Sequence, residues 1–358
     1  MKLSVPFIPD PAYAGFLAER SSSLASVYFP LPSGPGEPVL DSRVRVPHNR
    51  QSPDILEKTL VPLGKVKKYL LVNTRFLPPG LYTDAAALNR FLDRISRLNA
   101  QVGITGLVIS DFYLANALDR TGHEVIPALE AVPGVNCMMD SPDKVAAYTE
   151  IIEQTRFKLP GRLLIDRSLN RDLHALNALA SNTKRQIPGI RVELLANEGC
   201  ILHCPFKPSH DAQVALSNTG LVREATWMIN RTAGCHSYFF KHPHRFLKSP
   251  FIRPEDTARY RDVADTIKLC GRTLGPGFLA RCINAYLDQS FDGNLLDLMD
   301  ATAFMADRFH IGNKALEPDF FNTVTTCTKA CKQCRMCEKL FQKAAYRKSV
   351  GFKPYKEI

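Results

Sequence analysis

The chain has 358 residues, 45% of them hydrophobic, and a formal net charge of +11 at pH 7. This length suits one large core, such as a (β/α)-barrel of about 250 residues followed by a smaller module. No run of about 18 apolar residues occurs, so we expect no membrane span. Pro6, Pro9, Asp10 and Pro11 interrupt the N-terminal apolar stretch, which argues against a signal peptide. We therefore expect a cytoplasmic protein.

Short β-rich runs alternate with amphipathic stretches along the first part of the chain. Strands are predicted at 3–8, 26–32, 69–76, 106–110, 134–139, 162–166, 191–197 and 265–272. Between them, 85–100, 141–156 and 169–181 carry apolar residues at helical spacing. This alternation predicts a parallel sheet. Eight strands favour an irregular TIM-type (β/α)8 barrel. A doubly wound sheet is the alternative, but neither GxGxxG nor GxxxxGK[ST] is present to support it.

Two long segments interrupt the alternation. Residues 31–46, rich in Pro, Gly and charge, predict a loop at the C-terminal rim of the barrel, where active sites are built. Residues 203–262 form a second excursion, with a helix predicted at 223–230, and insertions of this length are usually functional. The alternation stops after residue 285. We therefore predict a barrel domain at 1–285 and a small, helical, Cys-rich and basic module at 286–358.

A first set of four cysteines is predicted to meet at the barrel rim. Cys200 and Cys204 follow the seventh predicted strand, Cys235 lies in the second excursion, and Cys270 ends the eighth strand. Disulfides are rare in the cytosol, so such cysteines are better read as metal ligands or catalytic groups. Four thiolates suit a [4Fe–4S] cluster or tetrahedral zinc. Alternatively, Cys235 and Cys270 are ordinary buried thiols.

A second set of four cysteines is confined to eleven residues. The spacing C-x3-C-x2-C-x2-C joins Cys327, Cys331, Cys334 and Cys337. It is related to the bacterial ferredoxin run but has a different order. Lys329, Lys332 and Arg335 lie between the thiols, where positive charge lowers thiolate pKa values and partly offsets the charge of a cluster. We predict a second iron–sulfur cluster here, with structural zinc as the alternative.

The basic character of the chain is concentrated in this tail. Residues 327–358 carry a net charge of +7, which leaves about +4 for the rest of the chain. A basic tail either forms a solvated helix or contacts RNA, a membrane surface or an acidic partner.

Polar residues follow several of the predicted strands, at the rim where a barrel places its catalytic groups. They are Asn73, Arg75, Ser110, Asp111, Asp140, Asp166, Arg167, Asn197 and Glu198. The alternative for each is a helix N-cap or a loop hydrogen bond. We predict catalytic roles for Glu198, because it neighbours Cys200, and for Arg167, because arginine suits a carboxylate-bearing donor. His210 is a further catalytic candidate, able to move protons beside the cysteines.

Three motifs in succession resemble the peptidase U32 family. They are VELLANEGCILHCPFKPSH at 192–210, NRTAGCHSYF, and FIRPEDTARYRDVADTIKLCGR, whose Lys268, Gly271 and Arg272 match a K-x-x-G-R element. The resemblance covers roughly residues 65–285 and implies a TIM-like barrel. Several members are expected to hold a [4Fe–4S] cluster on four cysteines. They act in oxygen-independent hydroxylation of ubiquinone precursors or RNA bases, with prephenate implicated as oxygen donor.

The resemblance implies an iron–sulfur redox enzyme with one or two clusters and a small organic substrate. An electron donor or a paralogous partner subunit is also implied. In this chain, Cys270 stands where the family usually has an acidic residue, and the cysteine spacing differs from that of the quinone-hydroxylating members. Two alternatives remain: an enzyme that modifies tRNA or rRNA bases, and a zinc-stabilised binding protein without catalysis. A peptidase is disfavoured because neither GxSxG nor HExxH occurs.

Overall fold

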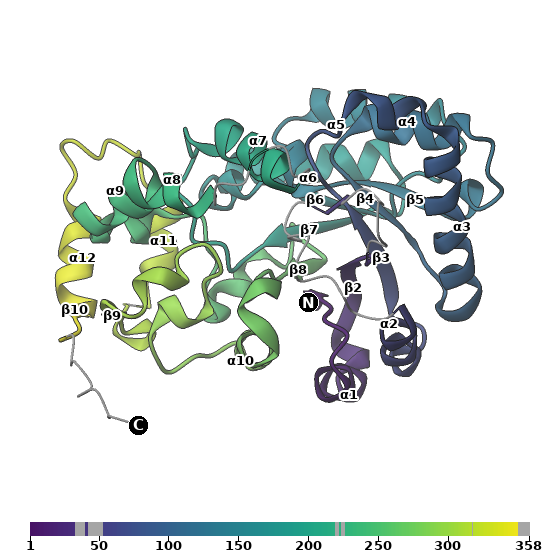
Figure 1. Ribbon diagram of the computed structural model, residues 1–358. Helices are drawn as coiled ribbons and strands as arrows, with labels where there is room; N and C mark the ends of the chain where they lie inside the picture. The colour runs from purple at the N-terminus through teal and green to yellow at the C-terminus, as the bar shows by residue number, and fades with distance from the viewer. Residues whose placement is uncertain (33–39, 42–52, 219–221, 223–225, 317, 350–358) are drawn as a thin grey trace.

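The computed structural model describes residues 1–32, 40–41, 53–218, 222, 226–316 and 318–349. Eight parallel strands of this part form one sheet in the order β5-β4-β3-β2-β1-β8-β7-β6 (Figure 1). The strands are β1 (Lys2–Pro6), β2 (Leu24–Pro30), β3 (Lys67–Val72), β4 (Gly106–Ile109), β5 (Glu130–Pro133), β6 (Arg162–Ile165), β7 (Arg191–Leu195) and β8 (Thr266–Lys268).

The sheet is nearly closed into a barrel. At its two edges, the segment that follows β5 approaches β6 through a parallel bridge between Met139 and Ile165. The backbone N–H of Asp166 donates to the carbonyl of Met139 at 2.8 Å. Every other neighbouring pair is joined by a parallel ladder. The predicted irregular TIM-type barrel is therefore confirmed, with its irregularity at the β5–β6 closure.

The fifth predicted strand, 134–139, is wrong. The strand β5 lies just before it, and residues Val135–Cys137 form a 3-10 turn instead. The backbone at Gly134 approaches the neighbouring strand so closely that a Cβ there would lie 2.6 Å from Ser110 Oγ. The apolar run EAVPGVNCMM spans both strand and turn, and hydrophobic periodicity does not locate the boundary within so short a run.

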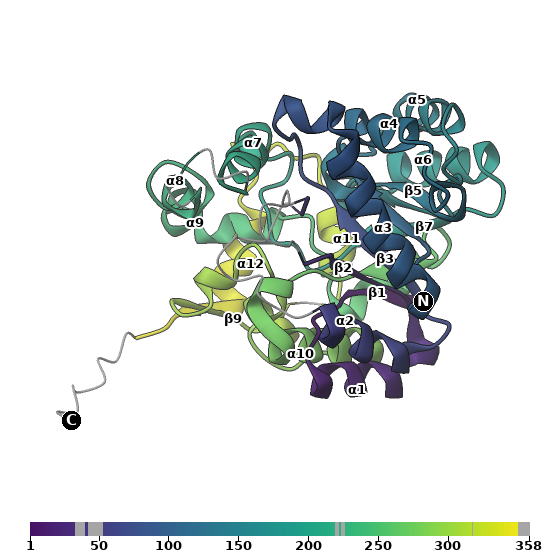
Figure 2. The same cartoon turned by 45° about the vertical axis from the view of Figure 1, so that its right-hand side comes forward.

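Helices surround the sheet as an outer layer (Figure 2). The first seven are α1 (Pro11–Glu19), α2 (Pro53–Leu60), α3 (Ala85–Val102), α4 (Phe112–Arg120), α5 (Pro142–Glu153), α6 (Leu173–Gln186) and α7 (Lys207–Asn218). In α3, Asp84 caps the N-terminus by accepting from the N–H of Ala87, and Gly103 ends the helix at φ 70°. Its buried stripe faces the sheet and consists of Leu88, Leu92, Ile95 and Leu98.

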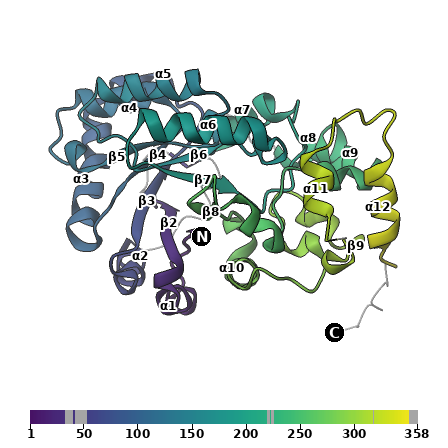
Figure 3. The same ribbon diagram turned by 180° about the vertical axis from the view of Figure 1, so that it is seen from behind.

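The chain after the barrel lies beside the second excursion. This side of the molecule holds α8 (Thr226–Thr232), α9 (Cys235–Lys241), α11 (Phe320–Thr325), α12 (Met336–Ala344) and the antiparallel pair β9 (Phe309–Ile311) and β10 (Ala345–Arg347). Figures 1 and 3 both show these elements gathered at one side of the barrel. The helix α12 packs against the 3-10 segment Pro243–Lys248 of the excursion, and α10 (Gly275–Asp288) packs against the 3-10 segment Pro254–Tyr260.

Two further expectations bear on this architecture. The loop predicted over 31–46 lies largely outside the described residues, and the predicted helix at 223–230 is described only from residue 226, where α8 begins. Within the described ranges, no helix combines the length and the apolar character that a membrane span requires.

Candidate cysteine sites and the polar rim

The C-terminal rim of the barrel holds a buried ion pair made of two predicted catalytic residues. Arg167 follows β6 and Glu198 follows β7, and Arg167 Nη1 lies 2.8 Å from Glu198 Oε2, with side chains only 7% and 9% exposed. Burial lowers the pKa of Arg167, but Glu198 and the other acidic groups nearby together raise it by more, so the net pKa is raised and the guanidinium stays charged. Glu198 also accepts a hydrogen bond from the Cys200 thiol at 3.3 Å.

A second group of charges at this rim involves Lys207 and Asp211 of α7. Lys207 Nζ is 2.7 Å from Asp211 Oδ2 and donates to the side chain of Asn136 at 3.1 Å. Arg75, which follows β3, donates to the backbone carbonyl of Asn136 at 2.6 Å and lies 3.9 Å from Asp211. The charge of Asp211 also acts on Arg167. The segments that follow β3, β5, β6 and β7, with α7 in the last of them, thus form one polar rim.

The sequence prediction included Arg75 but missed Asn136, Lys207 and Asp211. The only signal for the last two is a lysine and an aspartate four residues apart on a helix. Ordinary surface helices show the same pattern, so it does not indicate a site by itself.

The third predicted catalytic residue, His210, is on α7 beside Asp211. Its Nε2 lies 3.3 Å from the side-chain amide of Asn230 on α8. His236, on α9, stacks on the ring of Phe304 with 3.7 Å between ring centroids. Burial lowers the pKa of His236, and His210 lowers it further, so these two histidines lie close together.

Several other rim candidates have structural roles. Asp111 caps α4 by accepting from the N–H groups of Tyr113 and Leu114, and Asp166 accepts from the N–H of Ser168. Asn197 ties the end of β8 to the segment after α10, because its amide donates to the carbonyls of Cys270 and Leu298. These are the cap and loop roles that the sequence left open.

Three thiols of the first cysteine set are neighbours. Burial raises the pKa of Cys200 well above its ordinary value, and Cys204 adds to this shift. Burial and the nearby Cys204 also raise the pKa of Cys235 to about 11. Cys270 lies at the end of β8, where its N–H donates to Asn197 Oδ1 at 2.7 Å and its thiol lies 3.3 Å from the same oxygen.

The first set does not by itself form a site for one metal ion. Among the described residues, no group of three or more His, Cys, Asp or Glu side chains is arranged to hold a metal ion. Burial raises the pKa values of Cys200 and Cys235, so a metal or cluster bound there would have to displace the protons of these thiols. The roles of Cys200, Cys204, Cys235 and Cys270 as ligands stay a prediction.

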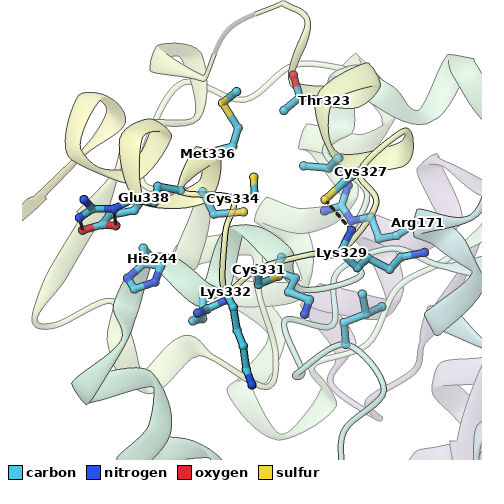
Figure 4. A pocket seen from close by; sticks show the side chains of 16 residues that line it. Arg171, His244, Thr323, Cys327, Lys329, Cys331, Lys332, Cys334, Met336 and Glu338 are labelled. Carbon is cyan, nitrogen blue, oxygen red and sulfur yellow. Dashed lines mark hydrogen bonds and ion pairs between the residues drawn. The ribbon is translucent and has the colours of Figure 1, made fainter.

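The second set lines a single cavity. All four thiols, from Cys327, Cys331, Cys334 and Cys337, border a space of about 320 Å³ (Figure 4). Burial raises the pKa of Cys337, and the negative charges of the other three cysteines raise it further, so all four lie within electrostatic reach. The N–H of Lys329 donates to Cys327 Sγ at 3.3 Å. Cys334 is exposed, which places the cavity at the surface.

Cations from three parts of the chain surround this cavity. They are Arg171 from the barrel, Arg245 and Lys248 from the excursion, and Lys329, Lys332 and Arg335 from the tail. Glu338, the carboxylate of the lining, is 2.8 Å from Arg335. The guanidinium of Arg171 is buried and donates twice to the carbonyl of Ser249, at 2.8 and 3.0 Å. The sequence analysis found the tail cations but missed those that reach the cavity from elsewhere in the chain.

The size and charge of the cavity can be compared with what each of the two predicted cofactors requires. Zinc binds sulfur at about 2.3 Å, so four ligands close tightly around one ion and leave no cavity. A [4Fe–4S] cluster held by four thiolates is larger and carries net negative charge. An open space with a cationic lining therefore fits the cluster better.

No family model matches the chain. It is 28% identical over 246 residues to a protein of Methanocaldococcus jannaschii named Uncharacterized protease MJ1657, covering 68% of this chain and 67% of the relative. Among solved structures, the U32 peptidase Mk0906 aligns with a TM-score of 0.45 and 11% identity over 75% of this chain and 92% of that one. Endonuclease IV from Thermus thermophilus aligns with a TM-score of 0.38 and 13% identity over 81% and 99%.

Proposed function

We propose that the chain is an iron–sulfur redox enzyme of the peptidase U32 family, whose succession of motifs it resembles and with which its relationship to an archaeal protein named as a protease agrees. The observation that carries this proposal is the cationic cavity lined by all four cysteines of the tail. Cys327, Cys331, Cys334 and Cys337 would hold a [4Fe–4S] cluster. When bound, such a cluster supplies one-electron transfer.

The cations around the cavity would stabilise this cofactor in a partly buried place. Burying negative charge without compensation costs several kcal/mol, in rough terms, and nearby cations offset this cost. Arg171 is fixed by its bonds to Ser249, while Lys329 and Lys332 stand on the cysteine segment itself. Their charge also favours the reduced, more negative form of a cluster. These residues would therefore raise its reduction potential.

The polar rim is the proposed substrate site. It carries three cations, Arg75, Arg167 and Lys207, against the carboxylates of Glu198 and Asp211. Glu198 holds Arg167 in place, whereas Arg75 is 32% exposed, lies 3.9 Å from Asp211 and donates to the backbone carbonyl of Asn136. Arg75 is therefore the rim cation best able to turn toward the carboxylate of an organic substrate. The proposed reaction class is oxygen-independent hydroxylation, or a related oxidation or reduction.

The name of the archaeal relative raises a protease as the second candidate. A cysteine protease needs a thiol whose pKa is lowered, so that it reacts as a thiolate. Burial instead raises the pKa values of Cys200, Cys204 and Cys235 at the barrel rim. This observation argues against a cysteine nucleophile at the barrel rim.

The test is anaerobic purification of the full chain, followed by a visible spectrum and analysis of iron, sulfide and zinc. About four irons and four sulfides per chain, with broad absorption near 400 nm, would support one [4Fe–4S] cluster, and about eight would support two. A colourless protein with zinc and no iron contradicts the proposal. Cleavage of a peptide library by the iron-free protein would instead support the protease.

A further inference from the structure

A second cavity opens at the opposite end of the barrel from the cysteines. It measures about 440 Å³ and is bordered by the first residues of six strands: Lys2, Leu24, Lys67, Arg162, Arg191 and Thr266. Because all eight strands are parallel, these residues mark the N-terminal mouth. The cavity is thus separate from the polar rim, which stands on the C-terminal ends of the strands.

This N-terminal mouth has an excess of positive charge. Among the described residues, its lining includes five cations, Lys2, Lys65, Lys67, Arg162 and Arg191, and a single carboxylate, Glu193. Glu193 forms an ion pair with Arg162, in which Glu193 Oε2 lies 2.8 Å from Arg162 Nη1 and both side chains are buried. Nearby, Glu130 lies 3.5 Å from Lys67. Its second oxygen, Oε2, accepts from the hydroxyl of Tyr69 and the N–H of Gly161.

Arg162 lines the cavity and carries a buried donor that lacks a partner among the described residues. Its side chain is only 6% exposed, and Nη1 bonds to Glu193 and to the hydroxyls of Ser4 and Ser26. The guanidinium lies on the ring of Tyr69, 3.8 Å from its centroid. Its Nε–H is buried and has no hydrogen-bond partner among the described residues. A buried donor left unpaired is destabilising, so such groups in proteins usually have a ligand or water as partner.

We propose that the N-terminal mouth binds the phosphate group of a small organic phosphate. Arginine and lysine together are the typical partners of phosphate oxygens, and a buried guanidinium fixes the position of the anion. The hydroxyls of Ser21 and Ser22 supply further donors. One wall is apolar, formed by the exposed Pro62 over the buried Leu24 and Leu63, and so offers Pro62 as a contact for the organic part of the ligand. The volume falls within the range of small-molecule sites.

The proposal is tested by calorimetric titration of the full-length protein with inorganic phosphate, with sodium chloride matched for ionic strength. The variant Arg191→Gln removes one cation of the mouth while its backbone bond to Gly161 is retained. The matched control Arg97→Gln removes an exposed arginine on α3, outside the cavity. We expect saturable binding at one site, weakened about fivefold by Arg191→Gln and unchanged by Arg97→Gln.

Absence of saturable binding, or equal weakening by both variants, would overturn the proposal, because either result indicates only a general effect of net charge. The second arm replaces inorganic phosphate with glycerol 1-phosphate and phenyl phosphate. If either ester binds more tightly than inorganic phosphate, the result supports an organic ligand that contacts the apolar wall. If both esters bind more weakly than inorganic phosphate, the result contradicts the proposed contact with the apolar wall. The readout is binding, so it does not depend on iron content or on the reaction at the rim.

Discussion

The two cysteine sets differ in how they are built. The tail set lies within eleven residues, and its four thiols share one cavity with six cations. The rim set comes from segments far apart in the sequence: Cys200 and Cys204 after β7, Cys235 on α9 and Cys270 after β8. Its thiols bond to barrel side chains, Cys200 to Glu198 and Cys270 to Asn197. Short spacing brings ligands together locally, whereas a dispersed set depends on the whole fold.

The two sets also differ in charge. The cations of the tail line the cavity beside the sulfurs, and their ion pairs are Arg335 with Glu338 and, at 3.9 Å, Lys329 with Asp172. At the rim, the charge of Arg167 is already balanced by Glu198. A negatively charged cofactor would therefore be stabilised by the excess positive charge in the tail. At the rim, the charge of Arg167 is already neutralised by Glu198 and would stabilise it less. This difference favours the tail as the place for a cluster and suggests three ways to test the comparison.

The largest expected effect is the loss of a whole cluster. Replacing Cys337, whose thiol interacts with the other three, by serine should remove about four irons per chain after anaerobic purification. The serine hydroxyl is a far weaker ligand for iron than a thiolate, so the cluster should not assemble. Iron and sulfide analysis, together with the visible spectrum, measures the effect.

Two matched variants sharpen this result. Cys137→Ala changes a buried thiol outside both sets and should keep full iron content. Cys200→Ser should keep the iron of the tail, whether or not a second cluster exists at the rim. If Cys337→Ser retained all iron while Cys200→Ser lost it, the roles that we assign to the two sets would be reversed.

The second effect concerns the compensated charge at the rim. Arg167→Met leaves Glu198 buried without its cation, which should lower the free energy of unfolding by about 3–5 kcal/mol. Urea denaturation followed by circular dichroism measures the change. The double variant Arg167→Met with Glu198→Leu removes both charges and should recover most of the loss. A single variant as stable as the wild type would show that the pair is not buried as described.

The smallest effect should be electrostatic tuning in the tail. Lys332→Gln removes an exposed cation that lines the cavity, and we expect the cluster potential to fall by on the order of 20–50 mV. Lys339→Gln, an exposed lysine on α12 outside the cavity, is the control and should shift the potential less. Redox titration by electron paramagnetic resonance measures both. Equal shifts would mean that only the net charge of the tail matters.

The pattern of the chain predicted the barrel but not its closure. Seven of the eight predicted strands overlap β1–β4 and β6–β8, because buried parallel strands read as short apolar runs between amphipathic helices. The remaining one, the fifth predicted strand at 134–139, was misplaced because one apolar run holds both a strand and a turn. The bridge between Met139 and Ile165, which brings the segment after β5 to β6, is a contact across the barrel that no local pattern records.

The residues of the candidate sites likewise fall into those that the sequence predicted and those that it did not. The tail cysteines and the cations between them could be predicted, because everything needed lies within one short segment. Arg171, Arg245 and Lys248, which complete the cavity, come from other segments and carry no local signal. The same holds for the pairing of Arg167 with Glu198 and for the approach of Asp211 to Arg75.

The sequence by itself therefore determined which elements form and which residues have the chemistry for a site. Hydrophobic periodicity and short-range spacing are properties of the chain alone. The tertiary structure decided which charges are balanced, which thiols share a cavity, and which donor at the N-terminal mouth lacks a partner among the described residues. These depend on distances between segments far apart in the chain, and those distances are set by how the sheet closes and how the helices pack on it.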